Sequence, residues 1–219
     1  RVLALANKEQ RGYITPQEFN LLANQAQMEI FEQYFYDQKS EDKNLKNSTE
    51  FSNVDEMLDE KISIFKITQA LSVSGSTGIL PGELYRLGSL FYGSSLIEVE
   101  QVTEEELMYL QQSPLAKPTL GMPAFVRTNG GSVTIHPTPV DVINCNYARI
   151  PLRVTWGYSV INDKALYNAG SSANFQLHRS DETELVYKIL SLAGIVIAKP
   201  GLGTFADGQI NAQKTQEKQ

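Results

Sequence analysis

Residues 15–37, TPQEFNLLANQAQMEIFEQYFYD, carry the strongest pattern in the chain and constrain its fold the most. Thr15, Pro16 and Glu18 are typical of a helix start. Thr15 and Glu18 can form a reciprocal capping box, and proline suits the first helical position. Apolar residues then recur with the period of a helix rather than with the alternation of a strand. The stretch therefore predicts a long amphipathic helix whose apolar stripe must be covered.

Length and composition are those of a folded chain. With 219 residues, 42% of them hydrophobic, it can bury a core as one large domain or two small ones. Its net charge of −6 and its scattered basic residues argue against sequence-independent nucleic-acid binding, which needs clustered Lys and Arg. No apolar run approaches the roughly 20 residues that cross a bilayer, so no membrane partner is expected. The single cysteine, Cys145, excludes an internal disulfide and fits a reducing compartment.

The domain organisation follows from changes of pattern along the chain. Residues 1–37 are expected to form an N-terminal helical layer. Residues 38–54 lose the periodicity and become polar, which predicts a linker. A β-rich core is expected over residues 55–199, followed by an extended polar tail over residues 200–219.

Strand patterns dominate the predicted core. Residues 61–68, KISIFKIT, alternate with one change of phase, as a strand with a bulge does. Asn129 and Gly130 can supply the positive φ angles of a tight hairpin between two alternating runs. The run around Pro151 predicts one more strand, whose second half lies at a sheet edge because proline cannot donate to a ladder.

Two helices are expected within this core. A second capping box, Thr103 with Glu106, opens a short helix over residues 104–112. A C-terminal amphipathic helix is expected over residues 181–193 and is predicted to stop at Gly194. The fold class that follows is α+β. It comprises an antiparallel sheet or small β-barrel, amphipathic helices at both termini and a polar C-terminal tail.

The sequence offers few candidates for chemistry. The two histidines, His136 and His178, fall in different predicted elements, and no cluster has the spacing of a zinc site. Sequence distance leaves a Cys145–His136 dyad open, although a cysteine in a strand is more commonly a small buried hydrophobe. No nucleophile elbow, phosphate loop or dinucleotide fingerprint is present. We therefore expect a non-enzymatic protein without a metal or a cofactor.

The carboxylates leave one alternative from another class. Glu98 and Glu100 alternate on one predicted strand face and, with Trp156 to stack a sugar, would suit a carbohydrate-binding or hydrolytic module. A solvated strand face explains the same pair of glutamates. Glu104 and Glu105 need no such role, because carboxylates favour the positive end of the helix dipole.

Five segments taken together and in order carry a resemblance. They are NKEQRGYITPQEFNLLANQAQMEIFEQYFYD, LPGELYRLGSLFY, EEELMYLQQSPLAKPTLGMPAF, YARIPLRVTWGY and SSANFQLHRSDETELVYKILSLAGIVI. This pattern resembles structural proteins of tailed bacteriophages of the short-tailed and crAss-like kind. Within that group it is most similar to head-to-tail connector proteins, the adaptor or ring components stacked below the portal. The resemblance covers most of the chain outside the linker and the tail, and it rests on packing patterns rather than chemical motifs.

The resemblance implies a virion structural protein, assembled in the host cytoplasm, that forms a cyclic homo-oligomer at the head-to-tail connector. A dodecamer is the symmetry that portal-associated rings imply. The implied partners are its own copies, the portal and neighbouring tail or connector proteins. DNA would pass without sequence-specific binding, because an acidic wall does not hold it. Another tail protein or a head-decoration protein is the alternative within the same particle.

The opening helix supplies the candidate subunit interface. Its polar face is mostly amide rather than charge, and amides and aromatic rings can be buried against a neighbour without stranding charge. The alternative is that this helix covers the sheet within one subunit. The candidate interface residues are Phe19, Leu22, Gln25, Gln27, Phe31 and Tyr34.

Overall fold

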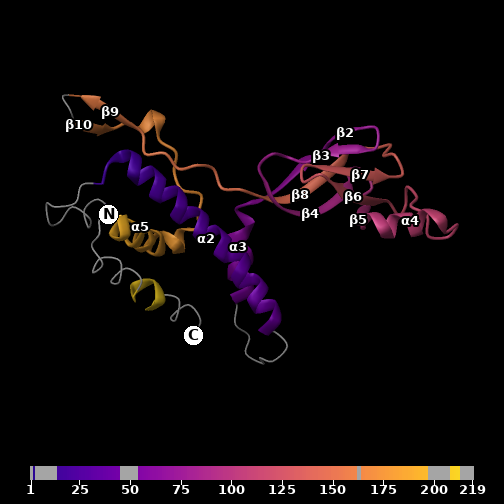
Figure 1. Ribbon diagram of the computed structural model, residues 1–219, viewed down its shortest axis with the longest axis horizontal. Coiled ribbons are helices and arrows are strands. Elements are labelled where there is room, and N and C mark those ends of the chain that lie inside the picture. The colour runs from indigo at the N-terminus through magenta and orange to yellow at the C-terminus, as the bar shows by residue number, and fades with distance from the viewer. Residues whose placement is uncertain (1, 3–13, 45–53, 162–163, 197–207, 213–219) are drawn as a thin grey trace. The chain divides into compact units, whose positions relative to one another are not determined.

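The chain divides into two compact units. The computed structural model describes residues 2, 14–44, 54–161, 164–196 and 208–212. Unit 1 comprises Arg1–Ile64 and Pro151–Gln219, and unit 2 comprises Phe65–Ile150. Unit 2 is therefore an insertion into unit 1, as the change of colour along the ribbon shows (Figure 1). The two ends of the insertion meet, because the Arg149 N–H donates to the Phe65 carbonyl at 3.0 Å.

Unit 1 is built on three helices. α2 (Pro16–Asn44) and α3 (Val54–Ser63) precede the insertion, and α5 (Glu182–Val196) follows it. Both α3 and α5 pack against α2, so the apolar stripe of α2 is covered by helices (Figure 1). The buried apolar residues of the three helices are Leu22, Ala23, Ala26, Ile30, Phe31, Tyr34, Leu58, Ile62, Leu185, Ile189, Leu190 and Ala193.

Shorter elements complete unit 1 after the insertion. β9 (Tyr158–Ile161) and β10 (Lys164–Tyr167) form a two-stranded antiparallel sheet. The 3-10 turns η1 (Ala169–Ser171) and η2 (Arg179–Asp181) follow. Gly157, just before β9, runs so close to η1 that a Cβ atom there would come within 2.7 Å of the η1 backbone. Only glycine fits this approach without moving the backbone.

Both predicted capping boxes are confirmed. The Thr15 N–H donates to Glu18 Oε2 at 2.9 Å, and the Glu18 N–H donates to Thr15 Oγ1 at 3.2 Å. Hydrogen bonds from the Thr15 backbone and hydroxyl lower the pKa of the Glu18 carboxyl, because they favour its charged form. Thr103 and Glu106 form the same arrangement at the start of α4 (Glu104–Gln112), which spans the predicted short helix.

Helix replaces part of the predicted linker and of the first predicted strand. α2 extends into the predicted linker 38–54, whose first residues include neither glycine nor proline and therefore tolerate a helix. Residues 45–53 lie outside the described part of the chain. α3 then takes up the start of the predicted strand 61–68. Leu58 and Ile62, four residues apart and both buried, form its covered face.

The C-terminal part also departs from the prediction. α5 begins next to the predicted start of the helix 181–193 but continues past Gly194. An isolated glycine costs only about 1 kcal/mol in a helix, and the apolar pattern of α5 continues beyond it. The predicted tail 200–219 lies outside the described residues except for 208–212, which are helical rather than extended.

Unit 2 is a nearly closed, barrel-like sheet of eight strands with the order β1-β8-β4-β5-β6-β7-β3-β2. The strands are β1 (Lys66–Ala70), β2 (Ser72–Ser74), β3 (Thr77–Ile79), β4 (Leu84–Tyr92), β5 (Glu98–Gln101), β6 (Ala124–Thr128), β7 (Ser132–His136) and β8 (Ile143–Arg149). Neighbours pair antiparallel except for β5 and β6, which are parallel. β1 and β2 are separated only by Leu71, so one bent segment supplies both edges of the sheet. The mixed α and β fold class and the helices at both ends are as predicted.

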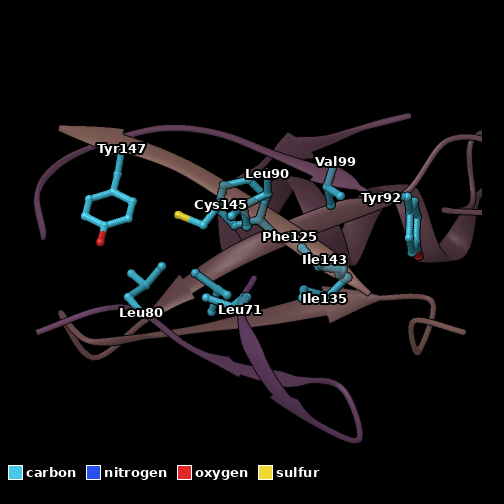
Figure 2. Packing of buried hydrophobic residues seen from close by; sticks show 11 residues of the cluster. Leu71, Leu80, Leu90, Tyr92, Val99, Phe125, Ile135, Ile143, Cys145 and Tyr147 are labelled. Atoms are coloured by element: carbon cyan, nitrogen blue, oxygen red, sulfur yellow. The ribbon is translucent and has the colours of Figure 1, made fainter. Parts of the chain in front are cut away.

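Alternating side chains fill the interior of this sheet. In β7, Val133 and Ile135 are buried while the residues between and beside them are not. Figure 2 shows the side chains of the buried cluster converging from several strands. The buried residues are Leu71, Leu80, Leu90, Tyr92, Val99, Phe125, Val133, Ile135, Ile143, Cys145 and Tyr147. At one end the Tyr147 hydroxyl lies 3.2 Å from both Gln69 Oε1 and Glu83 Oε1, which supplies its polar atom with partners.

The predicted hairpin joins β6 to β7. Thr128 and Ser132 face each other in register, and Asn129 and Gly130 between them have φ angles of 41° and 29°. These positive values are the backbone conformation that Asn and Gly adopt most readily. The hairpin could be predicted because its turn is specified by two adjacent residues.

Leu90→Ala should destabilise unit 2 by about 2–5 kcal/mol, because Leu90 is fully buried and its removal leaves a cavity in the buried cluster of the sheet. Urea denaturation followed by circular dichroism measures the change. Leu115→Ala is the matched control, since Leu115 is 99% exposed and its loss should change the free energy of unfolding little. Equal effects of the two substitutions would contradict the described core.

Candidate functional site

Three amides on α2 form a polar stripe along the helix. Asn20, Asn24 and Gln27 are spaced four and three residues apart and lie on one face. Four helical residues rise about 6 Å, close to the roughly 6.7 Å that two residues span in a strand. The stripe can therefore pair with every second residue of an extended chain, as the edge of a sheet does.

Residues 152–156, which follow unit 2 and which we call the returning chain, bind the centre and one end of this stripe. Asn24 Nδ2 donates to the Val154 carbonyl and the Val154 N–H donates to Asn24 Oδ1, both at 2.8 Å. The Trp156 N–H donates to Asn20 Oδ1 at 2.6 Å, and Asn20 Nδ2 donates to the Trp156 carbonyl at 3.3 Å. Each amide thus satisfies both backbone groups of one residue.

The other end of the stripe binds two segments at once. Gln27 Nε2 donates to the Leu152 carbonyl at 2.9 Å, and Gln27 Oε1 accepts from the Gln176 N–H at 3.0 Å. The Gln176 side chain completes the arrangement, because its Oε1 accepts from the Leu152 N–H at 2.9 Å. We call these contacts of Asn20, Asn24 and Gln27 the amide ladder. It replaces the sheet edge that the sequence predicted for the residues after Pro151.

Five of the six predicted interface residues are used inside unit 1. Leu22, Gln27, Phe31 and Tyr34 are buried against the other helices and the returning chain, and Phe31 is completely inaccessible. Phe19 is half-buried and packs edge-on against Trp156, with ring centroids 5.7 Å apart. The apolar stripe of α2 is covered by α3 and α5 of the same chain, and not by the sheet that the alternative from the sequence had it cover.

Gln25 is the predicted interface residue that lies on the exposed side of α2, where its Nε2 donates to Glu29 Oε1 at 3.1 Å. The same side carries two exposed apolar residues, Leu21 and Tyr36. A contact of α2 with a neighbouring subunit would therefore use this outer side rather than the predicted stripe.

A buried ion pair links α3 to η2, the 3-10 turn directly before α5. Lys61 Nζ of α3 lies 2.8 Å from Asp181 Oδ1, and both side chains are nearly inaccessible. The Tyr34 hydroxyl of α2 donates to the other carboxylate oxygen, and Ser180 Oγ donates to Oδ1 at 3.0 Å. Burial, and then the adjacent Asp181, raise the pKa of Tyr34, which therefore remains a neutral hydrogen-bond donor.

The cysteine and the histidines do not form a catalytic pair. Cys145 points into the core of unit 2, whereas His136 lies on the outward-facing side of β7. Burial raises the pKa of the Cys145 thiol to about 11, so the reactive thiolate is disfavoured. His178 accepts from the Ser180 N–H through Nδ1 at 3.3 Å and caps η2. Within the described ranges no group of three His, Cys, Asp or Glu residues is placed to hold a metal ion.

The carboxylates of the carbohydrate-binding alternative lie on the surface of unit 2. Glu98 and Glu100 are exposed on either side of the buried Val99. Trp156 belongs to unit 1, where it lines an apolar hollow of about 440 Å³ together with Phe19 and Phe175. Glu98 and Glu100 therefore lie on a solvated strand face, and the aromatic ring is part of a different structural unit.

Each unit has a segment that exposes several large apolar side chains. In unit 2 we call Met108, Tyr109, Leu115 and Met122 the α4 patch; each side chain is more than half exposed, and none of the described residues of α4 is buried. In unit 1 we call the two-stranded sheet of β9 and β10 the ribbon. At least half of the surface of each of four apolar side chains is exposed there: Val160, Ile161, Leu166 and Tyr167. Exposed apolar surface marks sites of protein interaction where it is extensive.

Sequence reasoning missed both exposed surfaces and the buried ion pair. The α4 patch lies partly in a loop without periodicity, and the ribbon is too short for a strand pattern to stand out. Lys61 and Asp181 are 120 residues apart, so no local signal links them. The amide-rich character of α2 was visible, but its partners were not.

Comparison with known proteins adds no further assignment. The sequence matches no protein-family model, and no curated protein gives a significant match. Among the described residues no helix is both long enough and apolar enough to cross a membrane. Function has therefore to be inferred from the contacts and surfaces of this chain.

Asn24→Ala should destabilise unit 1 by about 2 kcal/mol or more, because it leaves the N–H and the carbonyl of Val154 without their partners. Gln25→Ala, one position along the same helix, removes an exposed amide and should change stability by less than about 0.5 kcal/mol. Chemical denaturation followed by circular dichroism measures both variants. If they unfold at the same denaturant concentration, the amide ladder does not stabilise the fold.

Lys61→Met should destabilise unit 1 by about 3–5 kcal/mol, because the Asp181 carboxylate is then buried without its counter-charge. Adding Asp181→Asn should recover part of this loss, since the amide carries no charge and still accepts from Tyr34. A double-mutant cycle of unfolding free energies gives the coupling. Additive effects of the two substitutions would show that the pair is not energetically linked.

Proposed function

We propose that this chain is a non-enzymatic structural subunit of a tailed-bacteriophage virion, forming an oligomeric ring at the head-to-tail connector below the portal. The observation that carries the proposal is the pair of exposed apolar surfaces, the α4 patch on unit 2 and the ribbon on unit 1. Both lie outside the closed cores of their units. Such surfaces are costly in an isolated chain and are accounted for when neighbouring subunits cover them.

Two different surfaces are what a ring requires. In a cyclic assembly each subunit binds its neighbours head to tail, so it presents two unlike and complementary surfaces. The α4 patch combines a helix with a loop, whereas the ribbon presents strand edges and both faces of a hairpin. A subunit with these two unlike surfaces can contact two different partners.

The ribbon favours assembly for a second reason. A two-stranded sheet is marginally stable alone, and β9 and β10 pair with no third strand among the described residues. Exposed strand edges in monomeric proteins are commonly protected by charged side chains. The four residues of β9, Tyr158–Ile161, carry no charge. Packing of the ribbon against a neighbouring subunit would cover these groups.

The remaining properties agree with a structural role in the virion. The amide ladder and the buried ion pair fix the helices and the returning chain of unit 1, as a load-carrying subunit needs. A net charge of −6 suits a ring through which DNA passes without being held. The resemblance of the sequence to connector proteins favours this position, with the portal and neighbouring tail or connector proteins as further partners.

The native mass of the purified chain tests the proposal. Light scattering over a concentration series should give a large multiple of the 24.4 kDa chain, and negative-stain images should show closed rings. A chain that stays monomeric at every concentration, with a measurable hydrolytic or carbohydrate-binding activity, would contradict it.

A pair of variants makes this test specific to the exposed surfaces. Val160→Ser with Leu166→Ser should lower the native mass without unfolding unit 1, because both side chains are exposed on the ribbon. Leu21→Ser with Tyr36→Ser removes apolar surface of similar exposure from the outer side of α2 and should leave the mass unchanged. Loss of rings in the α2 variant alone would place the contact on that helix instead.

A further inference from the structure

The tip of the β6–β7 hairpin combines two residues whose neighbouring groups can react with each other. Asn129 is the only asparagine in the sequence that is followed directly by glycine. Asn129 and Gly130 are both exposed, and their φ angles are positive, 41° and 29°. Asparagine and glycine tolerate such angles better than other residues do. The turn therefore presents the Asn129 side chain and the Gly130 backbone to solvent.

The reactive groups of this pair are not held by the fold. Across the part of the chain that the structure describes, neither the Asn129 side-chain amide nor the Gly130 N–H has a hydrogen-bond partner. The turn is closed through the Asn129 carbonyl instead, which accepts from the Gly131 N–H and, at 3.2 Å, from the Ser132 N–H. A Cβ atom added at Gly130 would meet nothing within 4 Å. The space around the pair is therefore open.

The chemistry open to this pair is ring closure. When hydroxide removes the proton of the Gly130 N–H, the nitrogen becomes a nucleophile one residue away from the Asn129 side-chain carbonyl. Attack forms a bond between the Gly130 nitrogen and Asn129 Cγ and expels the side-chain nitrogen as ammonia, which leaves a succinimide. A side chain on the following residue hinders this approach, and glycine has none.

We propose that Asn129 is a site of spontaneous deamidation in the folded chain, through a succinimide formed with the Gly130 nitrogen. Water opens the succinimide, so the net reaction consumes one water and releases one ammonia. Opening at one carbonyl gives aspartate, and opening at the other gives isoaspartate, whose backbone runs through the former side chain. The reaction needs neither an enzyme nor a partner. The inference therefore goes beyond the proposed function and does not depend on it.

Other asparagines of the chain lack one or more of these conditions. Asn20 and Asn24 use both polar atoms of their side-chain amides in the amide ladder. Asn174 is exposed as Asn129 is, but it is followed by Phe175, whose side chain hinders the attacking nitrogen. Asn174 is therefore a matched reference for Asn129 within the same molecule.

The isoaspartate product has a structural consequence that the aspartate product lacks. The Gly131 carbonyl accepts from the N–H of Leu80 at 3.0 Å, and Leu80 belongs to the buried cluster of unit 2. Isoaspartate lengthens the backbone of the turn and so displaces Gly131 from this hydrogen bond. We expect the isoaspartate form to unfold at a lower denaturant concentration than Asn129→Asp, which carries the same charge on an unchanged backbone.

Incubation of the purified full chain in mildly alkaline buffer without denaturant tests the proposal. Samples taken over time are digested, and mass spectrometry detects the replacement of the amide by a carboxylate while chromatography separates aspartate from isoaspartate. The peptide that contains Asn129 should convert at least about tenfold faster than the peptide that contains Asn174, because glycine offers no hindrance. Circular dichroism spectra recorded during the incubation establish that the chain stays folded.

Two variants make the test specific to ring closure. Asn129→Gln keeps an amide but requires a larger ring, and Gly130→Ala places a methyl group in the path of attack. Each should slow conversion at this turn by at least about tenfold. Alanine is strained at the positive φ of Gly130, so Asn129→Gln decides the result if Gly130→Ala alters the fold.

Two results would overturn the proposal. One is conversion of Asn129 in the folded chain that is no faster than conversion of Asn174. The other is rapid conversion of Asn129 in denaturant alone, which would show that the hairpin protects the pair. Neither result bears on the native mass, so failure of this inference and failure of the proposed function are distinguishable.

Discussion

The hydrogen bonds between the amides of α2 and the chain returning from unit 2 are the constraint on which unit 1 depends. Unit 2, residues 65–150, separates α2 from residues 152–156 in the sequence. These two segments can therefore meet only after the whole of unit 2 has been synthesised. The returning chain has no sheet to join there, and its backbone groups must still be satisfied. Asn20 and Asn24 each hydrogen-bond both backbone groups of one residue in that segment. The apolar side of α2 can then pack against α3 and α5.

Features with a local cause could be predicted from the sequence. The capping boxes at Thr15 and Thr103 and the Asn129 turn depend on residues within three positions of each other, and all three form. The mixed fold class followed from the change of period along the chain. Helix ends were less predictable, because α2 continues through polar residues that carry no apolar pattern and α5 continues through Gly194.

The candidate surfaces could not be predicted in the same way. The amides of α2 suggested burial against a partner, and they are indeed partnered, but by segments 125–149 residues away in the same chain. A sequence pattern tells that a face is to be covered and not which chain covers it. The α4 patch and the ribbon illustrate the converse: only the packed structure reveals which apolar side chains remain uncovered.

The meeting of Phe65 and Arg149 at the base of unit 2 has an evolutionary consequence. Because the two ends of unit 2 are in contact, its insertion costs unit 1 little more conformational entropy than a short loop would. The entropy of closing a loop also grows only slowly with the length of the loop. The β unit can therefore lengthen, shorten or be exchanged for another domain while the helical host keeps its core. Related proteins can therefore differ in the sequence and the binding surfaces of unit 2 while unit 1 keeps the same packing.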